Sequence, residues 1–362
     1  MSNCVTIIIP ALNPGADFPS YCAALRKSTR APILIVDDGS RADCAEIFDA
    51  CTKSGDHISV IRHDVNRGKG RALKTAFAKL LKDPSVIGCV TCDSDGQHTP
   101  ADVVRCIDEL EANPEAFILG CRTFNLEHVP WKSRFGNTTM CTLFKLVTGR
   151  AITDTQTGLR AIPAGFMREL LDCPGERFEY ETNMLLRIGE RPLIQLPIET
   201  VYIDGNRETH FDPFKDSAKI TAILLRHGIV RFGMFIIASL LSFGVDIGLF
   251  SLLYRVILPD TLKGRLLIAV VAARMVSIVF NYCCNRFVVF ADGYRTGDRH
   301  FGKKEFGKYL LLAAGILCAS YLFTALAGKL FPSVKIEILK ACVDLLLFLA
   351  SYSVQRLMIF RS

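Results

Sequence analysis

Four long apolar stretches in the second part of the chain constrain its fold more than any other feature of the sequence. The first 225 of the 362 residues have the mixed polar and apolar composition of a soluble domain, whereas apolar runs dominate from residue 229 onward. About 20 apolar residues are enough for a helix to cross a bilayer. The stretches long enough to do so are residues 229–254, 265–290, 308–331 and 336–360. The sequence therefore predicts a soluble domain over residues 1–225 and a membrane domain with four spanning helices over residues 226–362.

Basic residues between the apolar stretches indicate how the membrane domain is oriented. Cytoplasmic loops carry an excess of lysine and arginine. The loop between the second and third stretches carries five such residues, namely Arg295, Arg299, Lys303, Lys304 and Lys308. We expect this loop, both termini and the soluble domain on the cytoplasmic side, because no signal peptide precedes the first strand. The segment 212–225 mixes charged and apolar residues, which predicts a helix lying along the membrane surface.

Charge and cysteine usage exclude other classes of partner and compartment. The net charge of +7 is modest, and many basic residues lie between apolar runs, so a membrane surface is a simpler partner than nucleic acid. The 14 cysteines are scattered, which favours reduced thiols on the cytosolic side over a secreted disulfide framework. Cys89-Val90-Thr91-Cys92 has CxxC spacing, but alternating strand residues are a better interpretation than a redox or zinc site.

Six polar or charged residues interrupt the apolar stretches or lie near them: Asp246, Arg274, Asn281, Asn285, Arg286 and Asp344. Ionisable residues are costly in hydrocarbon and therefore suggest a function by default. The alternative is that Arg286 reaches the membrane interface and that Asp246 or Asp344 pairs inside the helix bundle. The sequence leaves both interpretations open.

In the soluble half, apolar runs alternate with amphipathic stretches. The runs interpreted as buried strands are Val5–Pro10, Ile33–Val36, Ser59–Arg62, Val86–Cys92 and Ala116–Gly120. The stretches interpreted as helices are residues 17–28, 42–53, 70–82 and 100–112. Strict alternation predicts right-handed βαβ units and an α/β fold with a mostly parallel sheet, covered by helices on both faces.

Polar motifs follow the ends of the expected strands, where open α/β sheets bind their ligands. In chain order they are Pro10-Ala11-Leu12-Asn13-Pro14-Gly15, Asp37-Asp38-Gly39-Ser40, Asn66-Arg67-Gly68-Lys69-Gly70, Asp93-Ser94-Asp95-Gly96-Gln97-His98 and Arg122. One acidic strand end alone would be read as a helix cap. Several polar ends converging on one edge of the sheet favour a binding site.

The fourth motif carries the chemistry of a metal site. Asp93 and Asp95 flank Ser94, so both carboxylates can face one point in a turn. Carboxylates, water and phosphate oxygens are ligands that suit Mg²⁺ or Mn²⁺, and Gln97 offers a further oxygen or a hydrogen bond. Such a metal would neutralise a leaving diphosphate as a sugar–phosphate bond breaks.

The second and third motifs suit the rest of a nucleotide. Asp37 and Asp38 are hydrogen-bond acceptors placed where a base or ribose would lie. The glycine-rich loop over residues 66–70 opens a helix and offers backbone N–H groups and the Lys69 cation to phosphates. The spacings of a Walker P-loop and of GxGxxG are both absent, which argues against a P-loop nucleotidase and a nicotinamide enzyme.

Taken in order, these motifs resemble glycosyltransferase family 2 over residues 4–220. The resemblance also uses Ile7-Ile8-Ile9-Pro10 and Asp154-Thr155-Gln156-Thr157-Gly158-Leu159-Arg160. It implies a GT-A fold. Within the family, the chain is most similar to the group of dolichol-phosphate mannose synthases and bactoprenol glucosyltransferases. That group implies a nucleotide-sugar donor such as a UDP- or GDP-hexose, and a polyprenyl phosphate acceptor of the undecaprenyl or dolichyl type.

The resemblance also assigns roles to individual residues. The residues implied to bind the nucleotide are Pro10, Leu12, Asn13, Val36, Asp37, Asp38, Lys69, Asp93, Ser94 and Asp95. Those implied to hold the metal and diphosphate are Asp93, Asp95 and Gln97. The catalytic set is Asp95, Asp154, Arg122 and Arg134, with the two arginines near the donor or acceptor phosphates. Glu179 or Glu181 matches a further acidic position at the start of a helix, and the sequence does not choose between them.

Two segments depart from the group's pattern. Leu12 and Pro14 replace an aromatic and an acidic residue of the first loop, and residues 205–211 replace an RxxGxSK-like segment. The acceptor-phosphate set is therefore Arg122, Arg134, Arg207, His210 and Lys215. A polyprenyl phosphate is already an anionic nucleophile and needs positioning, for which arginine is well suited. We accordingly expect Asp154 either to orient the acceptor or to cap a turn.

The run Phe280–Phe290 resembles the GtrA-like membrane family over residues 225–362, whose members are implicated in moving lipid-linked sugars across membranes. The leading hypothesis is a polyprenyl-phosphate glycosyltransferase joined to such a membrane domain, and a homo-oligomer is compatible with it. A glycosyltransferase for another lipid or glycan is one alternative, although the QxxRW segment of processive synthases is absent. A non-enzymatic translocator of lipid-linked sugar is the other, and the Asp93/Asp95 pair argues against it.

Overall fold

The computed structural model describes residues 4–122, 131–189, 191–199, 215–259, 261–290, 302–334 and 336–360. The chain divides into two compact units. The first, here called the sheet unit, contains residues 1–145 and 151–224. The second, the helical unit, contains residues 146–150 and 225–362. Each unit is described by itself.

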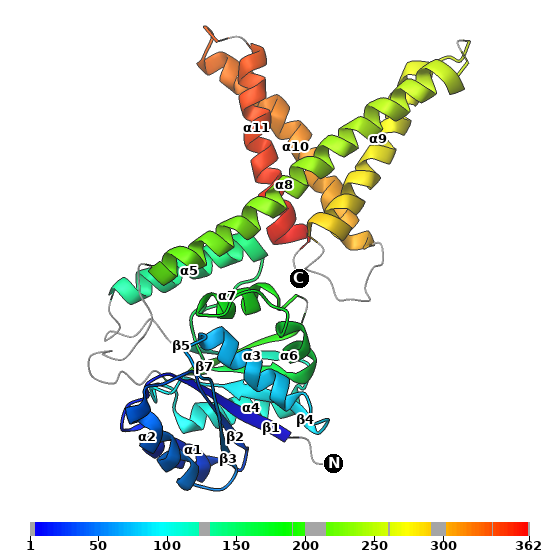
Figure 1. The fold of residues 1–362 in the computed structure, drawn as a ribbon. Coiled ribbons are helices and arrows are strands. Elements are labelled where there is room, and N and C mark those ends of the chain that lie inside the picture. Colours follow the sequence, from blue (N-terminus) through cyan, green and yellow to red (C-terminus); the bar gives the residue numbers. More distant parts are fainter. Residues whose placement is uncertain are drawn as a thin grey trace. The chain divides into compact units, whose positions relative to one another are not determined.

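A seven-stranded sheet forms the centre of the sheet unit, with the order β3-β2-β1-β4-β6-β5-β7 (Figure 1). The strands are β1 (Cys4–Ala11), β2 (Ile33–Asp37), β3 (Ile58–Arg62), β4 (Val86–Thr91), β5 (Phe117–Arg122), β6 (Arg160–Pro163) and β7 (Leu193–Ile198). All neighbours pair in parallel except β6, which is antiparallel to both β4 and β5. The predicted α/β fold with a mostly parallel sheet is confirmed.

Helices follow most strands of the sheet unit. They are α1 (Phe18–Ser28), the 3₁₀ turn η1 (Ala42–Cys44), α2 (Ala45–Lys53), α3 (Lys69–Leu80), α4 (Pro100–Ala112), α5 (Trp131–Thr148), α6 (Ala164–Leu170) and α7 (Glu179–Leu186). The start of α4 illustrates the local cause. The Thr99 side chain accepts a hydrogen bond from the Asp102 N–H, and Pro100 occupies the first helical turn, where its missing N–H costs nothing.

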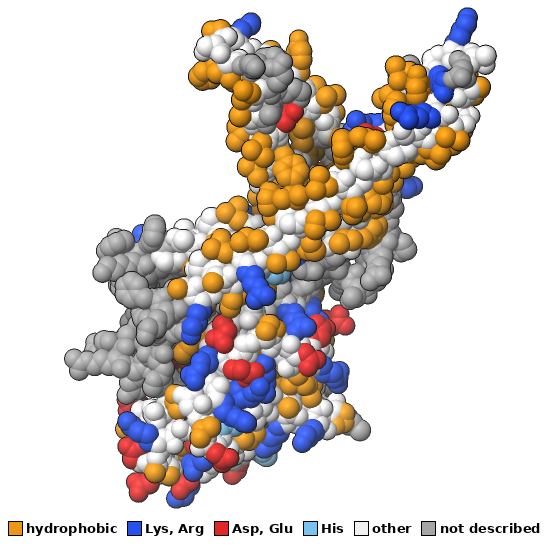
Figure 2. Space-filling view, turned by 45° about the horizontal axis from the view of Figure 1, so that its top comes forward, with side chains coloured by type: hydrophobic (Ala, Val, Ile, Leu, Met, Phe, Trp, Pro, Cys, Tyr) orange, Lys and Arg blue, Asp and Glu red, His pale blue; other side chains and the backbone are white. Residues whose placement is uncertain are grey.

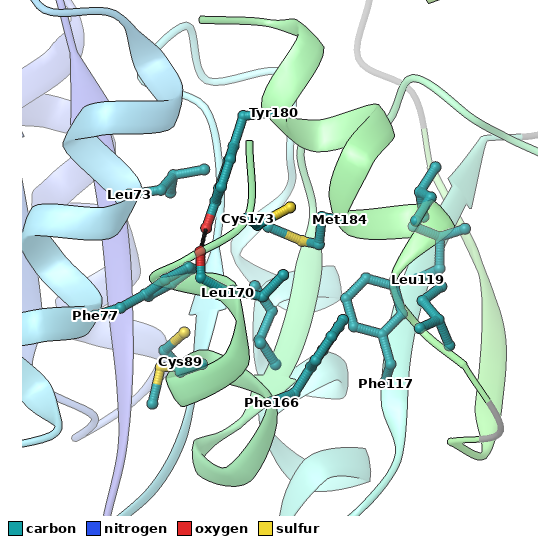
Figure 3. Close-up of a cluster of buried hydrophobic side chains, with 14 of the residues drawn as sticks. Leu73, Phe77, Cys89, Phe117, Leu119, Phe166, Leu170, Cys173, Tyr180 and Met184 are labelled. Atoms are coloured by element: carbon teal, nitrogen blue, oxygen red, sulfur yellow. Dashed lines mark hydrogen bonds between the residues drawn. The ribbon is translucent and has the colours of Figure 1, made fainter. Parts of the chain in front are cut away.

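The sheet separates two hydrophobic cores, because successive side chains of a strand point to opposite faces. Ile8 of β1 belongs to one core, whereas Ile7 and Ile9 belong to the other. Figure 3 shows the first core, where the buried Tyr180 hydroxyl donates to the Leu170 carbonyl oxygen at 2.8 Å. This bond satisfies the one polar atom that Tyr180 brings into an apolar environment. The cores hold the strand ends rigidly at one edge.

Four described helices are long and apolar enough to cross a membrane, and together they make up most of the helical unit. They are α8 (Lys215–Leu252), α9 (Arg265–Cys284), α10 (Lys303–Leu330) and α11 (Ile336–Val354), and three π-helical turns follow them, namely η3 (Leu253–Ile257), η4 (Asn285–Val289) and η6 (Gln355–Ile359). Figure 2 shows hydrophobic side chains along these helices, whereas charged side chains gather over the sheet unit.

The segment 212–225 does not form a helix of its own. Residues 212–214 lie outside the described residues, and from Lys215 onward the chain is the first part of α8. No proline or glycine occurs between residues 215 and 227, so nothing in the sequence interrupts the helix. Ile220 and Leu224 are buried in the core of the sheet unit. Core packing explains these two apolar positions, and the predicted location of the segment at a membrane surface stays a prediction.

Candidate active site

A cavity of about 510 Å³ opens at the carboxyl ends of the strands. Of the residues that the sequence predicted to form the site, ten line it: Pro10, Leu12, Asn13, Asp38, Lys69, Asp93, Ser94, Asp95, Gln97 and Arg122. Pro10 and Arg122 lie at the ends of β1 and β5, and the other eight come from the segments that follow β1, β2, β3 and β4. The convergence of these motifs at one edge of the sheet is thus observed.

Four other predicted site residues lie in the described part of the chain but do not line this cavity, and the side chains of three more are not described. Val36 lies within β2 and Asp37 at its end, and both side chains are buried. Asp154 is buried completely. Arg134 lies on α5 with an exposed side chain. Lys215 begins α8, but its side chain lies outside the described set. Arg207 and His210 also lie outside the described residues.

The two carboxylates after β2 hold neighbouring loops in place. Asp37 accepts the Ser40 N–H at 2.8 Å and pairs with the Arg62 guanidinium at 2.6 Å. Asp38 accepts the N–H groups of Arg67 at 3.0 Å and Gly68 at 2.7 Å. The carboxylate of Asp38 thereby shapes the glycine-rich loop, and the same residue reaches the cavity wall.

Gly68 is needed in this loop for two reasons. Its φ is +101°, a value that side chains other than glycine rarely adopt. A Cβ added there would lie 2.3 Å from the Glu176 carbonyl oxygen. The loop therefore approaches the chain before α7 closely, and Lys69 follows at the first position of α3.

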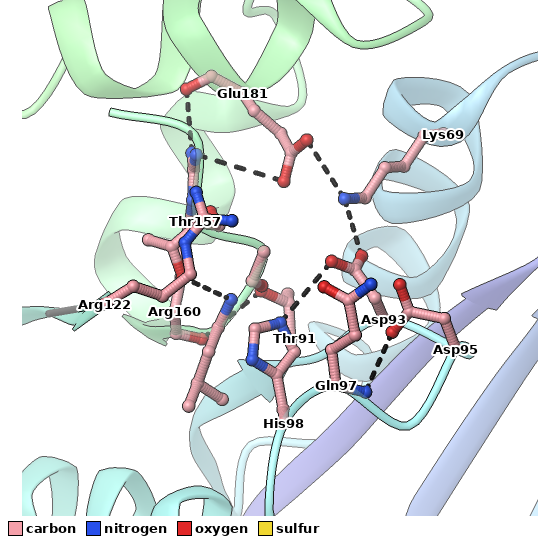
Figure 4. Close-up of polar contacts among 12 residues, drawn as sticks. Lys69, Thr91, Asp93, Asp95, Gln97, His98, Arg122, Thr157, Arg160 and Glu181 are labelled. Carbon is pink, nitrogen blue, oxygen red and sulfur yellow. Dashed lines mark hydrogen bonds and ion pairs between the residues drawn. The ribbon is translucent and has the colours of Figure 1, made fainter. Parts of the chain in front are cut away.

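Lys69 links two acidic side chains across the cavity. Its Nζ lies 2.7 Å from Oδ1 of Asp93 and 3.0 Å from Oε2 of Glu181 (Figure 4). Burial alone would lower the pKa of Lys69, but the two carboxylates hold it well above its ordinary value. Lys69 is therefore a charged ammonium wherever pH is near neutral. Of the two acidic residues considered at α7, Glu181 lines the cavity and Glu179 does not.

Asp93 and Asp95 have contrasting electrostatic surroundings. Burial opposes ionisation of Asp93, but Lys69 and His98, the latter 3.4 Å away, hold its pKa well below the ordinary value. Burial and the nearby charge of Asp93 raise the pKa of Asp95 instead. Asp95 Oδ1 accepts the Gln97 N–H at 3.0 Å. The pair thus presents excess negative charge to the cavity at Asp95.

Asp93 also requires a glycine opposite it. A Cβ added to Gly158 would lie 2.2 Å from Oδ2 of Asp93. The Gly158 carbonyl oxygen accepts the Thr91 hydroxyl at 2.8 Å, which fixes this backbone against the end of β4. The close approach explains why the segment before β6 carries glycine at this position.

Arg122 is held by a carboxylate beneath it. Its Nε and Nη2 donate to the two oxygens of Asp154 at 2.7 and 3.0 Å, and Asp154 also accepts the Gln156 N–H at 3.0 Å. Asp154 is fully buried, whereas Arg122 reaches the cavity wall. A two-point pair of this kind fixes the plane of a guanidinium. The carboxylate is placed to orient Arg122 rather than to touch a bound molecule.

Several residues of the cavity were not predicted as site residues. Arg160 is buried, with Nε donating to the Thr157 carbonyl oxygen at 2.9 Å and Nη1 to that of Glu181 at 2.8 Å. Arg177, Phe178 and Thr182 line the cavity from the segment at α7. Arg160 belongs to a motif that the sequence analysis used. No motif in the sequence marks the other three residues, which line the cavity because of the position of α7.

The donor set fits a divalent cation only in part. Within the described ranges, no three His, Cys, Asp or Glu side chains cluster as a ready-made metal site. Asp93 and Asp95 nevertheless supply carboxylate oxygens to the cavity. Burial, together with the charge of Asp93, raises the pKa of Asp95, and a bound cation would oppose both effects. A cation with few protein ligands and several phosphate or water oxygens is the usual arrangement for Mg²⁺.

The sequence matches known protein families in both parts of the chain. Residues 6–187, half of the chain, match the family model described as glycosyl transferase family 2. The chain belongs to glycosyl transferase family 2. This glycosyltransferase also matches, over residues 234–360, the model of the GtrA/DPMS transmembrane domain. Both predicted resemblances, the GT-A fold and the enzyme class are confirmed.

Three curated relatives show how this family 2 glycosyltransferase compares. An uncharacterized protein of Methanocaldococcus jannaschii is 30% identical over 207 residues, which cover 55% of this chain and 82% of that protein. UDP-N-acetylglucosamine–dolichyl-phosphate N-acetylglucosaminyltransferase of Methanococcus voltae is 26% identical over 55% of this chain and 86% of the relative. Polyprenol monophosphomannose synthase of Mycolicibacterium smegmatis is 27% identical over 46% and 62%, respectively. The two named relatives differ in sugar and share a polyprenyl phosphate.

Proposed function

We propose that this glycosyltransferase moves a sugar from a nucleotide-sugar donor to a membrane polyprenyl phosphate. The observation that carries the proposal is one cavity that holds an acidic pair, Asp93 and Asp95, together with the Arg122 guanidinium. Four helices able to cross a membrane belong to the same chain, so a lipid acceptor would be at hand. The polyprenyl-phosphate names of two relatives support the same acceptor class.

The donor would lie along the ends of β1, β2 and β4. Pro10, Leu12, Asn13 and Asp38 line that side of the cavity and would receive the nucleoside of a UDP- or GDP-hexose. The Asn13 N–H donates to the Ser40 hydroxyl at 2.9 Å, which ties the first two loops together. Two loops fixed in this way form a preorganised wall, which reduces the ordering cost of binding.

Asp93, Asp95 and Gln97 would hold Mg²⁺ or Mn²⁺. The metal would supply positive charge to the diphosphate as it leaves. Lys69 already balances Asp93 in the structure, so it would share that carboxylate with the metal and add a second positive charge near the phosphates.

Arg122 would orient the acceptor phosphate, with Asp154 acting as its positioning residue. In the transfer, an oxygen of the polyprenyl phosphate forms a bond to the anomeric carbon of the sugar. The bond from that carbon to the donor β-phosphate oxygen breaks, and the electron pair leaves with the nucleoside diphosphate. Because the acceptor oxygen is already anionic, no side chain has to remove a proton, and positioning carries the catalysis.

The proposal places the sheet unit on the cytoplasmic side, where nucleotide sugars are made. It is supported by the basic residues Lys303, Lys304 and Lys308 at the start of α10, which favour a cytoplasmic location for that helix end.

An acceptor comparison tests the proposed function. Full-length protein in detergent is supplied with a radiolabelled nucleotide sugar and either polyprenyl phosphate, the matching uncharged polyprenol, or a glycan. The proposal predicts organic-extractable radiolabel with polyprenyl phosphate alone. Equal product with polyprenol would show a lipid hydroxyl acceptor, and product only with the glycan would show a glycan-extending enzyme; either result rejects the proposal.

A further inference from the structure

The helical unit contains an internal repeat that relates α8 and α9 to α10 and α11. Gly228-Ile229-Val230-Arg231-Phe232-Gly233-Met234-Phe235 parallels Gly302-Lys303-Lys304-Glu305-Phe306-Gly307-Lys308-Tyr309. Further along, Tyr282-Cys283-Cys284-Asn285-Arg286 parallels Tyr352-Ser353-Val354-Gln355-Arg356, and Phe290 parallels Phe360. Each half therefore pairs a segment of one helix, inside α8 or at the start of α10, with a segment at the end of the next helix.

Contacts in the structure follow the same correspondence. Tyr282 packs on Phe306 with ring centroids 5.0 Å apart, and its counterpart Tyr352 packs on Phe232 at 5.1 Å. Both second segments run into π-helical turns, η4 and η6. The two halves meet through equivalent residues, because the Asn285 amide donates to Gln355 Oε1 at 2.9 Å.

Charge breaks the symmetry at one pair of positions. In one half, Nη1 of Arg286 lies 4.0 Å from Oε2 of Glu305. In the other half, Arg356 takes the place of Arg286, and Arg231 takes the place of Glu305. Phe232, the residue after Arg231, packs on Tyr352, one helical turn before Arg356, with ring centroids 5.1 Å apart. The two arginines therefore come from neighbouring parts of α8 and η6. One half thus places an arginine beside a carboxylate, and the other has arginines at both equivalent positions.

Arg356 is poorly satisfied for a buried cation. Its side chain is 3% exposed, and its Nε and Nη2 have no hydrogen-bond partner. Its neighbours include the Tyr352 hydroxyl and the Phe290 ring, whose centroid lies 5.7 Å from the guanidinium carbon. Buried guanidinium N–H groups without acceptors are costly, as is a second positive charge beside them. An anionic ligand would offset both costs.

We propose that Arg231 and Arg356 form a binding site in the helical unit for a phosphate group. Guanidinium groups bind phosphate through paired, charge-assisted hydrogen bonds. Both arginines belong to helices that can cross a membrane, so a phosphate carried by a lipid is the ligand that this setting favours. This site is separate from the cavity of the sheet unit and does not depend on the function proposed for that cavity.

Saturation binding of radiolabelled farnesyl phosphate to the full-length protein in detergent tests the site. Arg356→Gln removes the unsatisfied cation, and Arg231→Glu recreates the balanced pair of the other half. Arg255→Gln, which alters an exposed arginine of η3, is the matched control. In wild type and in Arg255→Gln we expect one equivalent of farnesyl phosphate at this site, in addition to any that the cavity of the sheet unit binds. Arg356→Gln and Arg231→Glu should each bind that equivalent at least about tenfold more weakly. The difference between variants reports on the helical unit alone, whatever the sheet unit binds.

Competition identifies the source of the phosphate. If unlabelled farnesyl phosphate competes and inorganic phosphate does not, the ligand is a lipid phosphate. Equal competition by inorganic phosphate supports a site for phosphate itself. The proposal is overturned if Arg356→Gln and Arg231→Glu bind as wild type does, or if uncharged farnesol competes as well as farnesyl phosphate. Glu305→Arg gives an independent check, because it should create a second equivalent in the opposite half.

Discussion

Lys69 is the residue in which the charges of the cavity are balanced. Its ammonium contacts Asp93 on one side and Glu181 on the other, and its side chain is 17% exposed. Because two carboxylates share one cation, its removal leaves two partly buried negative charges beside Asp95. The acidic edge of the cavity should then depend more strongly on an external cation.

Lys69→Met should therefore lower stability by about 1–3 kcal/mol in the absence of divalent metal. Addition of Mg²⁺ should raise the melting temperature of the variant more than that of wild type, since the metal then takes over the role of the ammonium. Thermal unfolding with and without Mg²⁺ measures both effects. An equal Mg²⁺ response in the two proteins would show that Lys69 and the metal do not share Asp93.

Asp154→Asn tests whether the buried carboxylate works through Arg122. The variant keeps the size of the side chain but loses the charge that holds the guanidinium plane, so we expect a stability loss of about 3 kcal/mol. Transfer should fall roughly tenfold or more through a higher KM for the acceptor phosphate, with the KM for the donor nearly unchanged. Asp43→Asn, at a side chain 68% exposed, is the control. A loss confined to the donor KM would contradict the assignment.

At the residue scale, the sequence predicted the polar edge well because its motifs are local. Asp93, Asp95 and Gln97 follow one strand within five positions and lie together in the cavity. The orientation of Asp37 and Asp154 could not be predicted, since it depends on partners 25 and 32 residues away.

Among the elements that contribute to the site, β6 and α7 were least visible in the sequence. Strand β6 has only four residues, too few for a periodic pattern, yet it inserts antiparallel between β4 and β5. By contrast, the first five strands and four helices have strong apolar patterns, and they lie within a few residues of the predicted ranges. Short elements are set by tertiary packing, which local sequence does not reveal.

Helix α7 offers a matched pair of substitutions. Glu181 faces the cavity and binds Lys69, whereas Glu179 accepts the N–H groups of Glu176 and Arg177 at the start of the helix. Glu181→Gln should reduce transfer at least about tenfold, because it removes one of the two charges that position Lys69. Glu179→Gln should cost below about 1 kcal/mol of stability and leave transfer nearly unchanged. Steady-state kinetics of both variants decides, and equal losses would refute a special role for Glu181.

The thiols packed against the sheet predict how stability depends on alkaline pH. Burial raises the pKa of Cys92 and of Cys106 to about 12. A thiol whose pKa is higher in the folded than in the unfolded state contributes its full stabilisation of the folded state below the unfolded-state pKa, near 9. That contribution is lost as the pH rises toward the folded-state pKa, near 12. Stability should fall by roughly 1 kcal/mol per pH unit for each such thiol above pH 9. Cys106→Ala should show a shallower decline than Cys4→Ala in unfolding measured between pH 8 and 11; equal slopes would contradict this explanation.

At the scale of the whole molecule, the sequence separated a soluble half from an apolar half because composition changes abruptly near residue 226. It did not reveal the repeat of the helical unit, since the paired segments are short and the chemistry differs at Arg231 and Glu305. Only the contacts of Tyr282 and Tyr352 with their partner rings make the correspondence plain. The account that results is one chain in which a nucleotide-sugar cavity is joined to a unit that can hold lipid phosphate.

The most direct test of this account is the formation of lipid-linked sugar by the purified full-length chain. The assay contains polyprenyl phosphate, Mg²⁺ or Mn²⁺ and a panel of UDP- and GDP-sugars, and measures released nucleoside diphosphate together with organic-extractable sugar. We predict that at least one donor gives the two products in equal amounts, and that Asp93→Asn reduces both at least about 100-fold. Nucleoside diphosphate release without lipid-linked sugar, no product with any donor, or full activity of Asp93→Asn would contradict the account.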